Sequence, residues 1–332
     1  MIRLTAADEL FLHQIPEPFP NVVTHHDHWR ESYFFILHPR ATGGDVLALA
    51  MAHYPRREDM DALELGRIDG QRIFSHHVRP YGNDPHTTVV GPIAVTIVEP
   101  YKTVRLTADA AAAPVGLDLT FKARTQAYGL RRGTMKAGHE IIWDQSHMFQ
   151  SGTYTGTYTY AGKTYAVDDW WGQRDHSWGI RDHGRCPLWM WVAIQLPDGM
   201  LGVWHWEYAD GARVFSDGCF AAVDASEPVP VIDFRHDLHW IDVEGRPAQY
   251  GQDGSATAGV AGRVEFTLRG GRRVGVEVTG RWCAPYEPFH RGGFNEIAVS
   301  TDDGRTGTGT IEITGAHHWR FFPATKVANL PP

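Results

Sequence analysis

The sequence predicts an all-β protein, and three observations carry that prediction. Short runs of β-branched and aromatic residues alternate with turn signals such as Asp69-Gly70, a rhythm typical of antiparallel hairpins. The 35 glycines and 20 prolines disfavour long helices, whose interiors both residue types weaken. An apolar period of 3.6 residues is only weakly discernible, around 57–65. Strands this numerous hide their edges by closing into barrels or packing as two sheets, and a small barrel encloses one apolar ligand.

The hairpins follow from their turns, in chain order. Residues 65–68 are expected to return as 71–74 across Asp69-Gly70, and 153–160 as 163–167 across Ala161-Gly162. Further turns are expected at Pro197-Asp198-Gly199, Glu244-Gly245, Gly270-Gly271 and Asp302-Asp303-Gly304. We expect two domains, residues 1–165 and 166–332, because a tyrosine-rich hairpin ends near 165 and a new hairpin series begins with 189–208.

The second hairpin series carries four tryptophans. With a three-residue loop at 197–199, alternation places Trp204 and Trp206 on one face of the hairpin. Trp189 and Trp191 then lie on the opposite face. We expect some of these indoles to be plain packing.

Composition and charge exclude several classes of function. The 42% apolar and 21% charged content is typical of a soluble globular protein, and a net charge of −8 leaves no broad basic face for nucleic acid. The longest relevant apolar run, 46–52, falls short of the ~20 residues that span a membrane. Acidic residues at 8–9 do not fit a signal peptide. The three cysteines lack a Cys-x-x-Cys motif, so we expect a reducing compartment and a cytoplasmic protein. We expect a monomer or homodimer.

By composition, the segment that best fits a chemical site is 170–182, WWGQRDHSWGIRD. It lies in a stretch that holds eight of the chain's twelve tryptophans: Trp143, Trp170, Trp171, Trp178, Trp189, Trp191, Trp204 and Trp206. Indoles this dense, around a carboxylate and an imidazole, indicate an apolar pocket with one polar reacting point.

As a strand, this segment has two polar faces. Alternation assigns to one face Gln173, Asp175 and Ser177, and to the other Arg174, His176 and Trp178. The sequence leaves open which face lines a cavity. An apolar wall disfavours the charged form of a carboxyl and keeps its proton available, so an inward Asp175 would serve as a general acid.

A structural alternative is equally open. Arg174, Asp175, Arg181 and Asp182 can form an ion-pair network in which His176 is merely hydrogen-bonded. Glu31, in the aromatic run 29–35, is expected to pair with Arg174 or Arg181.

Asp175-His176-Ser177-Trp178-Gly179 resembles the Asp-His-x-Trp-Gly element of the carotenoid 1,2-hydratase and AttH-like superfamily. The resemblance is specific over 143–182, and its extended form is most similar to an uncharacterised bacterial branch. Members of the superfamily carry two lipocalin-like β-barrel domains and include hydroxyneurosporene synthases, fungal Diels–Alderases and a lipid carrier. In the hydratases the aspartate is the proposed proton donor to an isoprenoid double bond, helped by an upstream His-x-Trp pair and a tyrosine.

The resemblance makes Asp175 the expected acid. His147-Met148-Phe149 resembles the His-x-Trp pair, with Phe149 in place of the tryptophan. Gln173 stands where the family has its tyrosine, a departure for which Tyr154, Tyr158 or Tyr165 can supply a ring from a neighbouring strand.

We therefore expect two lipocalin-like domains that hold an apolar isoprenoid, steroid or aromatic-derived small molecule. The expected activity is a cofactor-independent hydratase or lyase, with Asp175 as general acid and His147 or His176 assisting. Aromatic faces stabilise the cation that protonation of an alkene creates. The expected substrate-binding side chains are Trp143, Phe149, Gln173, Trp178, Trp191, Trp204 and Tyr154. A non-catalytic carrier of lipids or terpenoids and a pericyclase or isomerase remain open as alternatives.

The remaining motifs give weaker indications of function. The histidine clusters are 25–28, His76-His77 and His317-His318; adjacent residues of a strand point to opposite faces, and only His26 and His28 share one. Without a cysteine or glutamate at ligand spacing we expect solvated histidines and no metal. Neither a phosphate loop nor a Gly-x-Ser-x-Gly elbow occurs, and Cys186 is expected to be a packed thiol.

Overall fold

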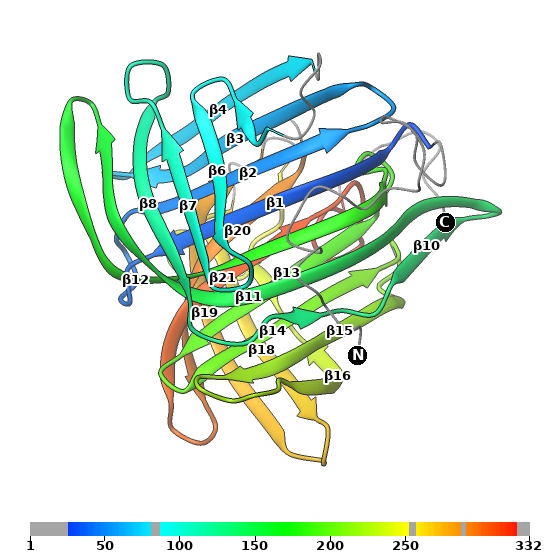
Figure 1. The fold of residues 1–332 in the computed structure, drawn as a ribbon. Coiled ribbons are helices and arrows are strands. Elements are labelled where there is room, and N and C mark those ends of the chain that lie inside the picture. The colour runs from blue at the N-terminus through cyan, green and yellow to red at the C-terminus, as the bar shows by residue number, and fades with distance from the viewer. Residues whose placement is uncertain (1–25, 81–86, 252–256, 287–289, 324–332) are drawn as a thin grey trace. The chain divides into compact units, whose positions relative to one another are not determined.

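The computed structural model describes residues 26–80, 87–251, 257–286 and 290–323. Within these ranges the chain forms β-strands and turns, without a helix (Figure 1). The described residues therefore contain no helix long and apolar enough to cross a membrane. The strands build two antiparallel sheets, which confirms the predicted all-β class with two lipocalin-like domains.

The first sheet curls into a nearly closed barrel, called barrel 1 below. Its strands are β1 (Trp29–His38), β2 (Val46–Tyr54), β3 (Asp59–Ile68), β4 (Gln71–Pro80), β5 (Val89–Val90), β6 (Ile93–Glu99), β7 (Thr103–Ala108), β8 (Val115–Ala123), β9 (Tyr128–Gly129), β10 (Gly133–Ala137), β11 (Glu140–Tyr160) and β12 (Lys163–Arg181). Their order is β4-β3-β2-β1-β12-β11-β8-β7-β6-β5, with β9 and β10 both paired to β11. Arg79 on β4 donates from Nε to the Val89 carbonyl on β5 (2.7 Å), which joins the two ends of this order.

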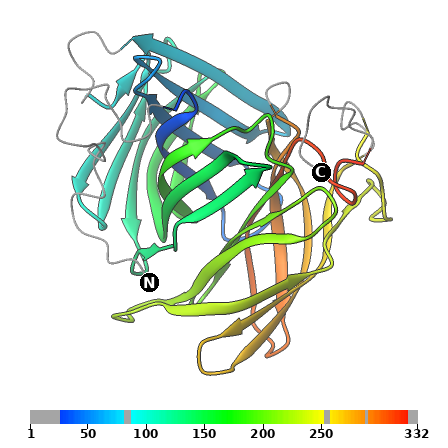
Figure 2. The same cartoon turned by 90° about the vertical axis from the view of Figure 1, so that its right-hand side faces the viewer.

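The second sheet closes fully into barrel 2. Its strands are β13 (Leu188–Leu196), β14 (Gly199–Glu207), β15 (Arg213–Ala222), β16 (Val229–His236), β17 (His239–Ile241), β18 (Gly259–Leu268), β19 (Arg273–Pro285), β20 (Gly292–Thr301) and β21 (Thr306–Thr314). The order β16-β15-β14-β13-β21-β20-β19-β18 is closed by pairing of β16 with β18, and β17 lies beside β18. Figure 2 shows this sheet curving from the green strands β13–β16 to the yellow and orange strands β18–β21.

Alternating side chains fill each barrel. Tyr33, Phe35 and Leu37 on β1 belong to the core of barrel 1, as do the inward residues of β2. Met190 and Val192 on β13 belong to the core of barrel 2. The period of two along each strand therefore separates an inner from an outer face in both barrels.

The division between the two units differs from the expected one after residue 165. One unit comprises Met1–Pro39, Gly44–Arg131 and Gln145–Arg181, and the other comprises Arg40–Gly43, Arg132–Asp144 and Asp182–Pro332. The reason is that β12 runs without interruption to Arg181, and its second half pairs with β1 from Trp171 to Ile180. A boundary at 165 would cut this ladder.

Most predicted hairpins are present. Asp69-Gly70 joins β3 to β4, Gly270-Gly271 lies between β18 and β19, and 302–304 lie at the β20–β21 turn. Ala161-Gly162 connects β11 to β12, which are neighbours in the sheet. Glu244-Gly245 turns inside the small loop closed by the bridge between Ile241 and Pro247. Most of residues 57–65, where the sequence shows a weak helical period, form part of strand β3.

The tryptophan hairpin corrects the expected arrangement. Its loop has two residues, because Leu196 pairs with Gly199. Trp189 consequently lies opposite Trp206, and Trp191 opposite Trp204, so that all four indoles share the outer face. The expectation of a three-residue loop was wrong, since a change of one residue in the register exchanges the faces of a strand.

Close backbone contact at Gly172 gives a test of the β1–β12 ladder. A Cβ added there would lie 2.0 Å from the Ile36 carbonyl oxygen and 2.8 Å from a ring carbon of Tyr154. We expect Gly172→Ala to lower the free energy of unfolding by about 2–3 kcal/mol through overpacking. Gly184→Ala, whose added Cβ meets only ordinary contact at 3.6 Å, is the control. Urea unfolding of both variants measures the difference, and equal stability would contradict the ladder.

Candidate functional site

The register between β1 and β12 fixes the direction of each side chain in the central segment. Arg174 lies opposite Phe35 and His176 opposite Tyr33, and both aromatic residues belong to the core of barrel 1. Residues directly opposite each other in an antiparallel pair share a face. Arg174 and His176 therefore point into barrel 1, whereas Asp175, opposite Phe34, lies on the outer face. The predicted alternation is confirmed.

Asp175 lies beside His147 of β11. Asp175 Oδ1 is 3.2 Å from His147 Nε2, and the two side chains are 10% and 4% exposed. The two residues that the motif singled out, 28 positions apart in the chain, are thus brought together. A nearly buried carboxyl and imidazole at this distance form an ion pair when the imidazole is protonated.

Inside barrel 1, a second carboxylate lies between two imidazoles. Glu31 Oε1 is 2.7 Å from His176 Nε2, and its Oε2 is 3.0 Å from His53 Nε2. All three side chains are fully buried. The ring of Tyr33 packs 4.5 Å from that of His176. Glu31 was expected to pair with Arg174 or Arg181; its contacts at 2.7 and 3.0 Å are with His176 and His53, and His176 points into barrel 1.

The expected arginine partners have contacts of their own. Arg174 is fully buried and donates from Nε and Nη2 to Gln150 Oε1 (3.0 and 2.8 Å), with its guanidinium 5.5 Å from the Phe121 ring. Arg181 Nη2 donates to the Ser32 and Ser177 hydroxyls (2.7 and 2.9 Å).

Asp182, the remaining member of the expected ion-pair network, lies 3.8 Å from Arg185. Its contact is therefore with the following turn.

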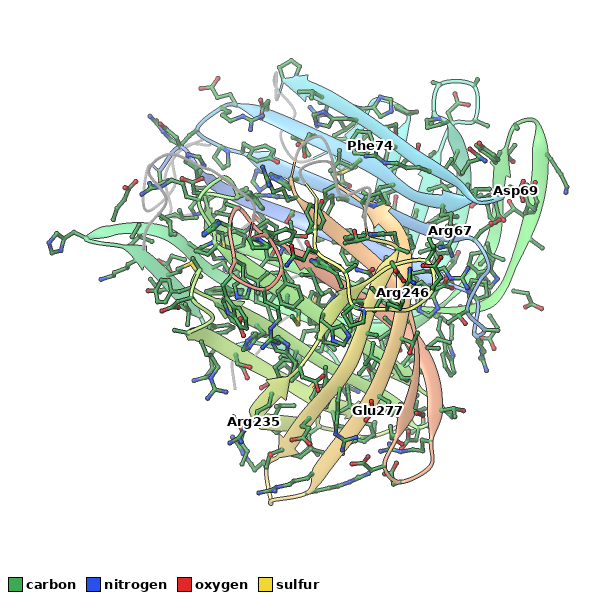
Figure 3. The ribbon with its side chains drawn as sticks, turned by 180° about the vertical axis from the view of Figure 1, so that it is seen from behind. Arg67, Asp69, Phe74, Arg235, Arg246 and Glu277 are labelled. Carbon is green, nitrogen blue, oxygen red and sulfur yellow. The ribbon has the colours of Figure 1, made fainter. Side chains whose placement is uncertain are left out.

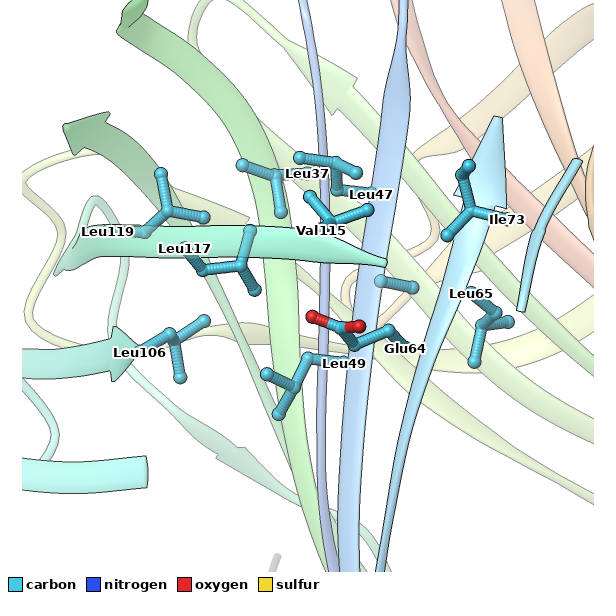
Figure 4. A pocket seen from close by; sticks show the side chains of 11 residues that line it. Leu37, Leu47, Leu49, Glu64, Leu65, Ile73, Leu106, Val115, Leu117 and Leu119 are labelled. Atoms are coloured by element: carbon cyan, nitrogen blue, oxygen red, sulfur yellow. The ribbon is translucent and has the colours of Figure 1, made fainter. Parts of the chain in front are cut away.

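A small cavity inside barrel 1 holds a carboxyl that the sequence analysis missed (Figure 4). Its volume is about 10 Å³, which is room for about one water. It is lined by Leu37, Leu47, Ala48, Leu49, Glu64, Leu65, Ile73, Leu106, Val115, Leu117 and Leu119. Glu64 Oε2 accepts a hydrogen bond from the Ser75 hydroxyl (3.0 Å). Burial raises the pKa of Glu64 to about 7, against the opposing effects of Ser75 and the Val115 backbone.

A signal for Glu64 was present in the sequence. On a strand, position 64 shares its face with Met60 and Ala62, which are core residues of barrel 1. The weak helical period around 57–65 concealed this alternation.

The predicted substrate-binding side chains divide between the two units. In the first unit, Phe149 packs 5.6 Å from Tyr128, the Tyr154 hydroxyl donates to the Gln173 carbonyl (3.1 Å), and Trp178 lies 5.2 Å from His176. In the second unit, Trp143 packs 5.1 Å from Trp189 and Trp191 packs 5.7 Å from Trp204.

The remaining motifs are placed as follows. His25 lies outside the described residues, His28 donates its backbone amide to the His26 ring (3.1 Å), and His76 contacts Asp61 (3.4 Å). Cys186 is buried, and burial raises the pKa of its thiol well above the ordinary value, as expected of a packed and unreactive cysteine.

The fold is that of a two-barrel, lipocalin-like protein. The sequence matches the family of unknown function DUF8625 over residues 4–282, and the chain belongs to that family. A search of curated proteins found no match.

Three solved structures share the fold. An AttH-like protein from Nitrosomonas europaea is 13% identical, with a TM-score of 0.59 over 91% of this chain and 98% of that one. Kievitone hydratase from Nectria haematococca is 12% identical (TM-score 0.54, 86% and 89%). CghA with Sch210972 is 13% identical (TM-score 0.57, 93% and 97%). At these identities the likeness shows a common fold, which confirms the lipocalin-like fold that the resemblance implies.

The raised pKa of Glu64 predicts a pH dependence of stability. Because the folded pKa of about 7 exceeds the ordinary value of 4.5, Glu64's contribution to stability is full below about pH 4.5 and is lost as the pH rises through 7. At about 1.4 kcal/mol per pKa unit the loss is about 3 kcal/mol. We expect Glu64→Gln to gain about that much stability relative to the wild type between pH 4.5 and pH 8.

Urea unfolding at several pH values measures this gain. Glu99→Gln, at a carboxylate that is 53% exposed and paired with Lys102, is the control and should follow the wild type. A Glu64→Gln curve parallel to the wild-type curve would contradict the burial of an ionisable group there.

Proposed function

We propose that this protein is a cofactor-independent hydratase or hydro-lyase that acts on an apolar small molecule, with Asp175 as general acid. The observation that carries the proposal is the nearly buried pair of Asp175 and His147, 3.2 Å apart on the outer face of barrel 1. Its support from outside the chain is that kievitone hydratase, a hydratase by name, has the same fold.

In the proposed reaction one proton moves from the protein to the substrate, and one proton returns from the added water to the protein. The Asp175 carboxyl gives its proton to one carbon of an alkene, and the other carbon becomes a tertiary cation. A water oxygen bonds to that cation and loses a proton, which His147 accepts and returns to the Asp175 carboxylate across 3.2 Å. The sum is addition of water across the double bond, and the reverse sequence removes water from a tertiary alcohol.

Aromatic residues supply the cation's surroundings in this proposal. Phe149 lies two residues from His147 and is fully buried, and a ring face stabilises a desolvated cation by up to ~2 kcal/mol. Gln173, two residues from Asp175 on the same face, takes the place of the family's tyrosine as a polar neighbour. Of the other expected contacts, Tyr154 belongs to the core of barrel 1 and Trp178 lies on its inner face, so neither shares the face of Asp175. Trp143, Trp191 and Trp204 belong to the other unit and take no part in this proposal.

Glu64 is a second candidate for the acid. Its carboxyl lies against a leucine-lined cavity, and a pKa of about 7 keeps much of it protonated at neutral pH. The two assignments differ in place, because Glu64 lies inside barrel 1 and Asp175 on its outer face.

Isotope labelling and four variants test the proposal. The wild type is incubated in H₂¹⁸O with panels of isoprenoid, steroid and phenolic alkenes, and mass spectrometry detects the addition of labelled water. We expect Asp175→Asn to lower turnover by ~10²-fold or more, because it preserves shape but has no proton to give. His147→Asn should lower turnover as well. Glu64→Gln and the control Asp118→Asn, at a side chain 61% exposed, should retain it.

Each other outcome has a defined meaning. Loss of turnover in Glu64→Gln alone would transfer the role of acid to Glu64. Turnover that survives both substitutions would rule out acid catalysis by either carboxyl and favour a pericyclase or isomerase. Binding of a panel compound without conversion, equal in all variants, is the result expected of a carrier.

A further inference from the structure

Barrel 2 encloses a cluster of three histidines and one glutamate that the proposed function does not use. His205 and Glu207 lie on β14, His236 is the last residue of β16, and His318 follows β21. Their side chains are 3%, 11%, 5% and 1% exposed. The spacing of two residues on a strand places His205 and Glu207 on one face. That face is the inner one, because Leu201 and Val203 of the same alternation belong to the core of barrel 2.

The potential ligand atoms converge on one point. Glu207 Oε1 is 2.9 Å from His205 Nε2 and 3.1 Å from His236 Nε2. The ligand atoms of these three residues all lie within 4.8 Å of one another. In a metal site with bonds of about 2.0–2.2 Å to nitrogen and oxygen, neighbouring ligand atoms are about 3 Å apart. The two separations from Glu207 Oε1, 2.9 and 3.1 Å, match the edges of such a coordination shell.

His318 has a different role, which its hydrogen bonds define. Its Nδ1 accepts hydrogen bonds from the backbone amides of Arg320 and Phe321 (both 3.2 Å). The ring proton therefore sits on Nε2, which donates to Glu207 Oε2 (2.9 Å). His318 thus orients the carboxylate through one oxygen and leaves the other facing His205 and His236.

The two facing imidazoles are not fixed in this way. The Nδ1 atoms of His205 and His236 are buried, and within the part of the chain that the structure describes they make no hydrogen bond. Without an ion, the Glu207 carboxylate can only accept, so each Nε2 donates its proton to Glu207 Oε1. An ion that takes the place of these protons would bind the Nε2 lone pairs, and each ring proton would move to Nδ1, which no described group occupies.

The cluster in barrel 1 shows what a bridging arrangement looks like instead. There, His176 and His53 bind different oxygens of Glu31, and all three side chains are fully buried. In barrel 2, two imidazoles face the same oxygen while the third holds the other oxygen. Convergence on one oxygen, with partial exposure of Glu207, distinguishes this cluster.

Aromatic rings and strand direction support the cluster. Phe234 packs edge-on 5.2 Å from the His205 ring, and Phe321 stacks on His318 at 5.3 Å. Arg235, between Phe234 and His236 in the chain, is 77% exposed and lies on the outside of β16 (Figure 3). Phe234 and His236, its two neighbours in the chain, consequently point into barrel 2. The strand therefore directs the His236 ring toward the cluster.

We propose that His205, Glu207 and His236 bind one divalent first-row transition metal ion, with His318 as the positioning residue of Glu207. Two imidazoles and one carboxylate are the donor set of open zinc sites and of the facial triads that hold Fe(II). Three protein ligands leave coordination positions for water or another small ligand. The proposal is independent of the hydratase proposal, since it concerns other residues in the other unit.

Metal binding is measured directly on the full chain. Protein stripped with a chelator is titrated with Zn(II), with Co(II) and, without oxygen, with Fe(II). We expect about one ion per chain, visible Co(II) absorption typical of nitrogen and oxygen ligands, and a higher Tm in the presence of the ion. His236→Gln and Glu207→Gln should abolish stoichiometric binding. His318→Gln should retain one site with about 10–100-fold weaker affinity.

The control is His239→Gln, at a histidine of the same unit whose Nδ1 faces the Asp237 carbonyl (3.3 Å). It should bind like the wild type. Absence of stoichiometric binding by folded wild-type protein for all three ions would overturn the proposal, as would equal affinity in His236→Gln. If the variants fail to fold, the wild-type Tm decides: no rise with any ion would overturn the proposal too.

Discussion

A carboxylate enclosed by a β-barrel is shielded from water and has to be stabilised by a neighbouring polar group. Transfer of an ion from water costs several kcal/mol, and only close partners recover that cost. Glu31 has two imidazoles at 2.7 and 3.0 Å, and Glu207 has three. Glu64 has a serine hydroxyl and remains poorly compensated, so its pKa rises to about 7. The partners of a buried carboxyl thus decide whether its pKa rises, as at Glu64, or falls, as at Glu207, where three histidine contacts outweigh the effect of burial.

Local sequence predicted the features that depend on neighbours in the chain. The Asp69-Gly70 turn and the alternation in β12 follow from two-residue periodicity and turn chemistry, and both are present. The predicted faces of the tryptophan hairpin were wrong because its loop is one residue shorter than expected. The predicted boundary after residue 165 differs from the observed division because β12 continues to Arg181. The turn signals did not indicate this length, which depends on pairing with the partner strand β1.

The buried clusters depend on contacts that local patterns do not contain. Glu31 and His176 are separated by 145 residues, and Glu207 and His318 by 111. They meet because β1 pairs with β12 in barrel 1 and because the chain after β21 returns to β14 in barrel 2. The pair His205 and Glu207 was visible as a local signal, but its partner His236 becomes a neighbour only when β14, β15 and β16 lie side by side.

The position of Asp175 on the outer face of barrel 1 favours it as the acid over the groups inside. Sites for small organic ligands commonly have volumes of about 300–1,000 Å³, whereas the cavity beside Glu64 measures about 10 Å³. Glu64 and Glu31 are both buried inside barrel 1, so a hydrocarbon substrate cannot reach either without displacing side chains of a close-packed core. Asp175 is also nearly buried, but no core of its own barrel encloses it. A carboxyl that meets a substrate of that size is therefore better placed on the outer face, where an imidazole from β11 already accompanies it.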